Sequence, residues 1–167
     1  MYSSIRPYIS SGDLLFYRGG ANLGSALVRW WTSSRYSHVG VAWCVGDRVL
    51  LLEAYPLKGV RLMPVSCRLP DAWLPTRAGW DGLAENYALA RLGMSYSFLD
   101  GVRSGLGLHT AAEGYQCAEF AAGVLQVCGL GVDCIATPED LLHWFVDRGY
   151  TFHSIGGSNE RTLGRND

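Results

Sequence analysis

The sequence predicts an α+β domain in which an antiparallel sheet packs against helices, and three observations favour this fold class. Two strand-like runs, His38–Val45 and Arg48–Tyr55, are separated only by Gly46-Asp47, a pair that suits the two-residue turn of a β-hairpin. A further strand-like run, Val60–Val65, extends the same sheet. The last third of the chain carries two segments with recognisable helix starts and stops.

Length and composition fit one compact domain. The chain has 167 residues, of which 49% are hydrophobic and 12% aromatic, more than a disordered chain carries. A chain of this length can bury a continuous core without disulfides or metals. We therefore expect a single domain over residues 1–167, with a core from about 11 to 155 and a polar tail over 156–167.

Charge and hydropathy exclude some partners. The 14 basic and 15 acidic residues leave a net charge of −1, so no strong field exists to hold nucleic acid, which is not expected as a partner. Residues 1–7 lack the apolar core of a signal peptide, and no apolar stretch is long enough to span a bilayer. We expect a protein that is cytoplasmic as synthesised and not stably inserted in a membrane. Association with a phage particle and export by a non-classical route stay open.

The cysteines fit neither a disulfide framework nor a four-cysteine zinc site, because their number is odd and no Cys-x-x-Cys pair occurs. A reducing compartment is the simpler interpretation. We expect no metal and no organic cofactor. The five residues are Cys44, Cys67, Cys117, Cys128 and Cys134.

Asp13–Tyr17 is a short apolar run that ends before a glycine pair. Leu23, Leu27 and Trp30 then recur at helical spacing and predict a helix over residues 21–32.

A loop-rich crossing is expected after the third strand-like run. Within it, Leu69–Trp80 is a candidate lid over a cleft. Leu83, Tyr87 and Ala90 then predict a helix stopped by Gly93. The prolines that mark the crossing are Pro64, Pro70 and Pro75.

Two helices and a short strand complete the predicted domain. The first helix covers about Gln116–Cys128 and is ended by the glycine that follows. The second has Thr137 as its N-cap and Pro138 at its first helical position, and it runs to about Arg148. The segment Tyr150–Ile155 is a candidate closing strand.

The hairpin brings a histidine and a glutamate together. Counting outward from a two-residue turn, Gly40 faces Glu53 and His38 faces Tyr55. His38 and Glu53 are then diagonal neighbours on one face, roughly 7–8 Å apart at the backbone, within reach of a long carboxylate side chain. Gly40 leaves space open opposite Glu53, so Glu53 can orient His38. An odd-length turn would reverse the parity and remove Glu53 from the site.

A cysteine at a helix start supplies the third group. Cys117, Ala121, Val124 and Cys128 lie on one helical stripe, which should face the sheet and point the Cys117 sulfur toward His38. Free N–H groups of a first helical turn stabilise a thiolate and can donate to an oxyanion. A thiol at a helix N-terminus beside a histidine has its pKa lowered from about 8.5.

Each of these residues has a structural interpretation when taken alone. Cys117 is then a core cysteine, His38 a satisfied strand histidine, and Glu53 a surface acid. Their joint placement favours a catalytic set. The remaining histidines have no comparable context and receive no role: His109, His143 and His153.

Several motifs resemble a known family, the circularly permuted members of the NlpC-like superfamily of papain-fold cysteine hydrolases, which also contains the lecithin:retinol acyltransferase-like proteins. Ser11–Phe16 is similar to the opening strand motif, Tyr36–Val41 to the histidine strand, and Tyr115–Phe120 to the nucleophile helix. Glu53 occupies the place of the third, polar residue. Thr137–Leu141 resembles a helix start that is common in the permuted group.

The resemblance covers most of the predicted core and implies a papain-like, NlpC-type fold in the permuted order, with histidine before cysteine. It implies that Cys117 is the nucleophile, that His38 is general base and then general acid, and that Glu53 holds the imidazole. One departure is Tyr96-Ser97, where the family leads us to expect tyrosine followed by aspartate. Asp100 is a candidate substitute, and the departure concerns substrate contacts more than chemistry.

The resemblance implies a cysteine peptidase or amidase without cofactor, acting on cell-wall stem peptides of peptidoglycan. Two alternatives stay open. A lipid-directed thiol acyltransferase or amidase would find support only in Trp30-Trp31. A non-catalytic binding, virion or secretion-associated module would keep the fold without the activity.

Overall fold

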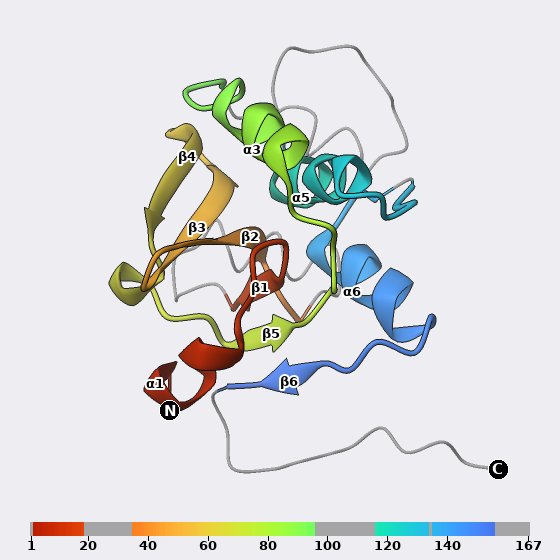
Figure 1. The fold of residues 1–167 in the computed structure, drawn as a ribbon. Coiled ribbons are helices and arrows are strands. Elements are labelled where there is room, and N and C mark those ends of the chain that lie inside the picture. Colours follow the sequence, from red (N-terminus) through yellow and green to blue (C-terminus); the bar gives the residue numbers. More distant parts are fainter. Residues whose placement is uncertain (1, 19–34, 96–115, 134, 156–167) are drawn as a thin grey trace, which may run out of the picture.

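The computed structural model describes residues 2–18, 35–95, 116–133 and 135–155, and within them six strands form one antiparallel sheet (Figure 1). The sheet order is β4-β3-β2-β1-β5-β6. The strands are β1 (Leu14–Tyr17), β2 (His38–Val45), β3 (Arg48–Tyr55), β4 (Gly59–Pro64), β5 (Ala72–Leu74) and β6 (His153–Ser154). The helices are α1 (Tyr2–Ile5), α3 (Gly82–Leu89), α5 (Cys117–Val127) and α6 (Pro138–Val146), with 3-10 turns η1 (Arg6–Tyr8) and η2 (Val65–Cys67).

This arrangement confirms an α+β fold. The expected helix over 21–32 and the polar tail over 156–167 lie outside the described residues. In the ranges that the structure covers, no helix has the length and apolar composition needed to cross a bilayer.

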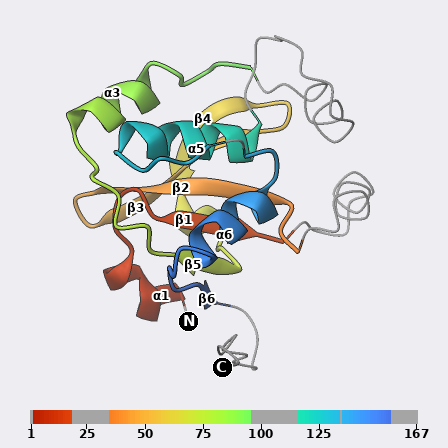
Figure 2. The ribbon, with the colours of Figure 1, turned by 90° about the vertical axis from the view of Figure 1, so that its right-hand side faces the viewer.

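The sheet has a core on each face. Helix α5 lies directly over β2 and β3, and α3 lies beyond α5 (Figure 2). The core on the α5 side is the larger of the two. It also includes α6 and buries residues such as Val39, Val41 and Phe120. The second core, on the opposite face, buries Leu15 and Leu51 beside the N-terminal segment. Side chains along each strand therefore alternate between two apolar environments.

The β2–β3 hairpin has the predicted register. Val45 pairs with Arg48 across the two-residue turn, and Val41 pairs with Leu52 further along. Gly46 has φ +54°, the left-handed conformation that such turns require and that glycine adopts without strain. The even turn keeps the parity that the sequence predicts for this strand pair.

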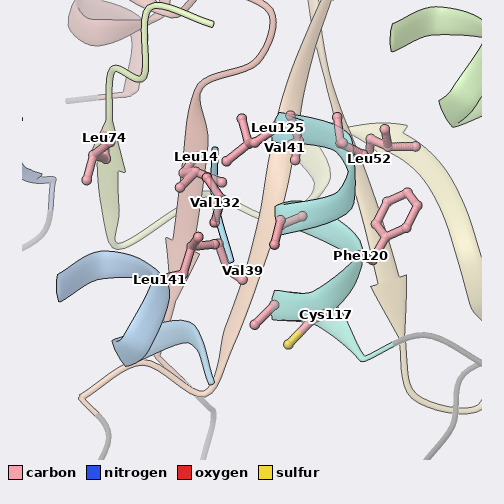
Figure 3. Close-up of a cluster of buried hydrophobic side chains, with 14 of the residues drawn as sticks. Leu14, Val39, Val41, Leu52, Leu74, Cys117, Phe120, Leu125, Val132 and Leu141 are labelled. Carbon is pink, nitrogen blue, oxygen red and sulfur yellow. The ribbon is translucent and has the colours of Figure 1, made fainter. Parts of the chain in front are cut away.

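Helix α5 presents its apolar stripe to the sheet as predicted. Cys117 and Ala121 on this stripe are buried, as are Val124 and Cys128 one and two turns further on. Figure 3 shows the Cys117 sulfur at the first turn of α5, beside the main core. The Glu119 carboxylate accepts a hydrogen bond from the N–H of the N-cap residue, which stabilises the helix start.

Helix α3 differs from its prediction in the face that it buries. Ala84 and Ala88 are buried, whereas Leu83 is 67% exposed. Small residues face α5 because the two helices pack closely: a side chain on Gly123 of α5 would run into the Tyr87 hydroxyl. The helix ends at Leu89, before the predicted glycine stop.

Gly93 has a different role from the predicted helix stop. Its N–H donates to the carbonyl of Val60 at 2.8 Å, and the Val60 N–H donates to the carbonyl of Met94 at 2.8 Å. These two bonds attach the segment after α3 to the edge strand β4. Helix α3 ends at Leu89 and is followed by a turn over residues 90–93.

The segment Leu69–Trp80 is not a lid. It contains β5, which pairs with β1 on one side and β6 on the other, and all three of its residues are buried. Periodicity missed this strand because only three residues lie between the flanking loops. The closing strand is likewise shorter than predicted and consists of His153–Ser154.

The Asp13 side chain hydrogen-bonds to the segment that precedes β1 and to residues in and after β5. Its carboxylate is 2% exposed and accepts hydrogen bonds from the Ser10 N–H at 2.9 Å, the Trp73 indole N–H at 2.9 Å and the Thr76 N–H at 3.1 Å. Three donors from different segments thus depend on one side chain. Removing it would leave buried donors without an acceptor.

We expect Asp13→Ala to lower the free energy of unfolding by about 2–4 kcal/mol, because each abandoned buried donor costs about 1–3 kcal/mol, offset in part by water. Urea denaturation followed by circular dichroism measures it. Asp47→Ala, in the exposed hairpin turn, is the matched control and should change the value by less than about 1 kcal/mol. Equal stability of the two variants would contradict the structural role of Asp13.

Candidate active site

The structure brings Cys117, His38 and Glu53 together from three different elements. Cys117 is the first residue of α5, His38 the first residue of β2, and Glu53 lies near the end of β3. All three are buried, with 6%, 5% and 0% of their surface exposed. Three titratable side chains in one buried cluster are a candidate active site.

His38 and Glu53 form the shortest polar contact of the cluster. The His38 Nε2 lies 2.5 Å from the Glu53 Oε2, across the β2–β3 strand pair. The imidazole lies between two aromatic rings, with centroid distances of 5.8 Å to Tyr17 and 5.6 Å to Tyr55. A carboxylate on one nitrogen and rings on both sides fix the orientation of the imidazole.

The Cys117 thiol is the other partner of His38. The two side chains are neighbours, and each shifts the pKa of the other. Because Nε2 is engaged by Glu53, Nδ1 is the ring nitrogen that remains for the thiol. A thiol, an imidazole and a carboxylate in series are the arrangement of an activated nucleophile, its base and the group that orients the base.

The pKa values of the thiol and the imidazole move toward a charged pair. Burial alone would raise the pKa of Cys117, but the hydrogen bond and charge of His38, with the N–H groups of Val39 and Ala118, lower it. Burial alone would lower the pKa of His38, but hydrogen bonds to Cys117 and Glu53 and the charges of both raise it. Both shifts favour the charged pair of thiolate and imidazolium over the neutral pair.

Glu53 is held in its ionised form. Burial would raise its pKa, but His38 and Arg61, through hydrogen bonds and positive charge, lower it below the ordinary range. The Arg61 Nε and Nη2 lie 2.8 and 2.6 Å from Oε1. The carboxylate therefore acts as an acceptor for both neighbours.

Gly40 contributes in a different way from the prediction. The space opposite Glu53 is not open: a Cβ on Gly40 would lie 2.5 Å from the Leu51 Cδ1 and 3.2 Å from the Glu53 Cβ. The neighbouring side chains pack directly over the glycine backbone. Gly40 is required because β3 side chains occupy that volume.

Sequence reasoning placed Tyr55 opposite His38 but missed three other residues around His38 and Glu53: Tyr17, Arg61 and Arg68. Arg61 lies directly opposite Glu53 on β4, and Arg68 follows η2. Tyr17 and Tyr55 carry the rings beside His38. Register counting across the β3–β4 hairpin would have found Arg61, but Leu57 occupies the left-handed turn position, at φ 64°, where glycine is the usual signal.

Comparisons with known proteins bear on the fold. No family model matches the chain, and no curated protein matches its sequence. The structure is similar to the crystal structure of the metalloprotein yiiX from Escherichia coli O157:H7, described as DUF1105. The match has a TM-score of 0.56 and 19% identity, and it covers 73% of this chain and 68% of yiiX. At this identity the likeness shows a common fold alone.

The described residues include no group of three or more His, Cys, Asp or Glu side chains arranged to hold a metal ion. The side chains around Cys117 contact one another in a row. The two oxygens of Glu53 contact His38 and Arg61, and they do not converge with Cys117 on one point where an ion could bind.

We expect Cys117 of the wild-type protein to react faster with iodoacetamide below pH 7 than an ordinary thiol does, because its lowered pKa increases the fraction that is thiolate. An ordinary thiol with a pKa of about 8.5 is only about 0.3% thiolate at pH 6. The rate should fall at least about tenfold in His38→Ala, which removes the cation that stabilises the thiolate.

Peptide mass mapping identifies the alkylated cysteine at each pH. Cys67, which is exposed, is the internal reference within the same sample. Slow labelling of Cys117 at pH 6 that is unchanged by His38→Ala would contradict the thiolate–imidazolium pair.

Proposed function

We propose that this protein is a cysteine hydrolase that cleaves an amide bond through an acyl-enzyme. One observation carries the proposal: the buried Cys117 thiol, the His38 imidazole and the buried Glu53 carboxylate come together from three elements, with the His38 Nε2 2.5 Å from the Glu53 Oε2. A structural core cysteine has no need of such a partner. In this chain Cys128 represents that ordinary case, because burial and the negative charge of Asp81 raise its pKa to about 11.

In the first step, the Cys117 thiolate attacks the carbonyl carbon of the substrate, and the C=O electron pair moves to oxygen. The N–H of Cys117, at the start of α5, is the proposed donor to that oxyanion, since an N–H at this position has no acceptor within its own helix. The His38 imidazolium then gives its proton to the leaving nitrogen as the C–N bond breaks. An amine departs and a thioester remains on Cys117.

In the second step, neutral His38 takes a proton from water, and the resulting hydroxide attacks the thioester carbon. Collapse of the tetrahedral intermediate breaks the C–S bond and regenerates the thiolate. The imidazolium is again present, and the carboxylic acid product leaves. Glu53 accepts a hydrogen bond from Nε2 throughout and keeps Nδ1 turned to the sulfur.

The finer fold proposal is a papain-like, NlpC-type domain in circularly permuted order. The order of the elements supports it, since the histidine strand precedes the nucleophile helix along the chain. The motifs of the sequence support it as well. The sheet-and-helix architecture common to this chain and yiiX is compatible with it.

Cell-wall stem peptides are the substrate class that we propose first. This choice follows from the resemblance of the motifs to cysteine hydrolases of peptidoglycan. A lipid-directed acyltransferase would use the same thioester and differs only in the acyl donor and in the final acceptor. The nature of the acyl group found on Cys117 therefore distinguishes the two substrate classes.

Metal binding is a competing function, because yiiX is called a metalloprotein. The contacts of Glu53 favour thiol chemistry in this chain. Arg61 occupies Oε1 with two hydrogen bonds, and a cation beside the carboxylate opposes the binding of a metal cation. Zinc titration with calorimetry would test this, and tight binding that Cys117→Ala and His38→Ala both abolish would favour the metal.

We expect the wild-type protein to release peptides from purified muropeptides, detected by liquid chromatography and mass spectrometry. Cys117→Ala should lower the rate at least about 1000-fold, since removal of a nucleophile abolishes covalent catalysis. Cys128→Ala is the matched control, because it removes a second buried cysteine from the same stripe of α5 and should leave the rate within about threefold.

Cleavage that persists in Cys117→Ala would contradict the proposed mechanism. Acylation of Cys117 by phospholipid vesicles without muropeptide cleavage would reassign the substrate to lipid. If neither reaction occurs and Cys117 is alkylated like an ordinary thiol, the protein is better described as a non-catalytic binding module that keeps the fold.

A further inference from the structure

Glu53 poses an electrostatic problem that the three-residue site does not solve. Its side chain has no exposed surface, and a carboxylate buried in this way is normally neutral unless cations and hydrogen bonds compensate for lost water. His38 supplies only one hydrogen bond, to Oε2. The other oxygen, Oε1, needs a partner of its own.

Arg61 supplies that partner from the neighbouring strand. It lies directly across from Glu53 in the β3–β4 register, and its Nε and Nη2 reach Oε1 at 2.8 and 2.6 Å. The guanidinium carbon lies 4.2 Å from the centroid of the Tyr55 ring, which also contacts His38. The arginine is thus held by a ring on one side and a carboxylate on the other.

We propose that Arg61 is a positioning residue for the nucleophile: by holding Glu53 ionised through Oε1, it directs Oε2 to the His38 Nε2 and so fixes the imidazole tautomer that serves Cys117. The inference rests on the proposed function, because it assigns Arg61 a role in activating that thiol. The contacts of Arg61 are with Glu53 and Tyr55 rather than with Cys117.

The tautomer explains why the charge of Glu53 matters. An ionised Glu53 can only accept, so the proton of neutral His38 resides on Nε2, and the Nδ1 lone pair faces the thiol. A protonated Glu53 would donate its own proton to Nε2. The imidazole proton would then reside on Nδ1, and His38 would no longer accept a proton from Cys117.

Arg68 provides an internal comparison. Its Nη1 lies 3.7 Å from the Glu53 Oε2, beyond hydrogen-bond distance, and its guanidinium carbon lies 4.2 Å from the Tyr17 ring centroid. It adds positive charge without directing either carboxylate oxygen. We expect Arg61 to affect the nucleophile more strongly than Arg68 does.

The test measures the rate of Cys117 alkylation by iodoacetamide from pH 5 to 9 in folded variants checked by circular dichroism. Arg61→Met keeps an apolar stem over Tyr55 and removes the charge and both hydrogen bonds. We expect at least about a tenfold loss at pH 6, equivalent to one pKa unit, with a smaller loss for Arg68→Met. Arg61→Lys should restore part of the rate. Arg48→Met, at the exposed far end of β3, should match the wild type.

A double-mutant cycle separates positioning from general damage. If Arg61 acts through Glu53, Arg61→Met should cost little further reactivity once Glu53→Gln is present. An alkylation profile of Arg61→Met equal to the wild type would overturn the inference, as would the same loss in both backgrounds. If Arg61→Met does not fold, Arg61→Gln replaces it under the same criteria.

The wild-type and His38→Ala profiles separate this inference from the proposed function. If wild-type Cys117 lacks reactivity below pH 7 that depends on His38, the proposed function fails and the role of Arg61 fails with it. If that reactivity is present and Arg61→Met retains it, only the inference about Arg61 fails.

Discussion

The burial of one negative charge organises the candidate site. Glu53 has no exposed surface, so its carboxylate is stable only where neighbouring strands supply compensating donors. His38 on β2 and Arg61 on β4 do so from either side of β3. The registers of two strand pairs therefore have to be correct at once. A slip of one residue in either pair would move a partner to the opposite face and leave the charge uncompensated.

The two faces of the sheet have distinct roles. The face under α5 is filled by apolar side chains, whereas the polar group of His38, Glu53 and Arg61 shares the opposite side with the second core. His38 is the first residue of β2, so its side chain lies at the end of the sheet, where the first residue of α5 comes within reach. This placement lets Cys117 belong to the main core and still bond to a polar neighbour.

Local sequence signals predicted the two strands and the helix that carry the site, and they predicted which strand residues share a face of the sheet. Gly46-Asp47 identified the hairpin turn, and the spacing from Cys117 to Cys128 identified the buried stripe of α5. Tertiary packing decided what the sequence could not indicate. Strand β5 is too short for a periodic pattern, Gly40 is crowded rather than open, and Leu57 in a left-handed turn concealed the hairpin that places Arg61 beside Glu53.

The most direct test of the ion pair is the ¹⁵N chemical shift of both His38 ring nitrogens, measured by NMR in the wild type and in Cys117→Ala. We predict an imidazolium at pH 7 in the wild type, because the thiolate and Glu53 raise the pKa of His38. In Cys117→Ala the pKa of His38 should fall, and the neutral ring should carry its proton on Nε2. A wild-type ring that is neutral at pH 7 and titrates identically in both proteins would contradict the thiolate–imidazolium pair.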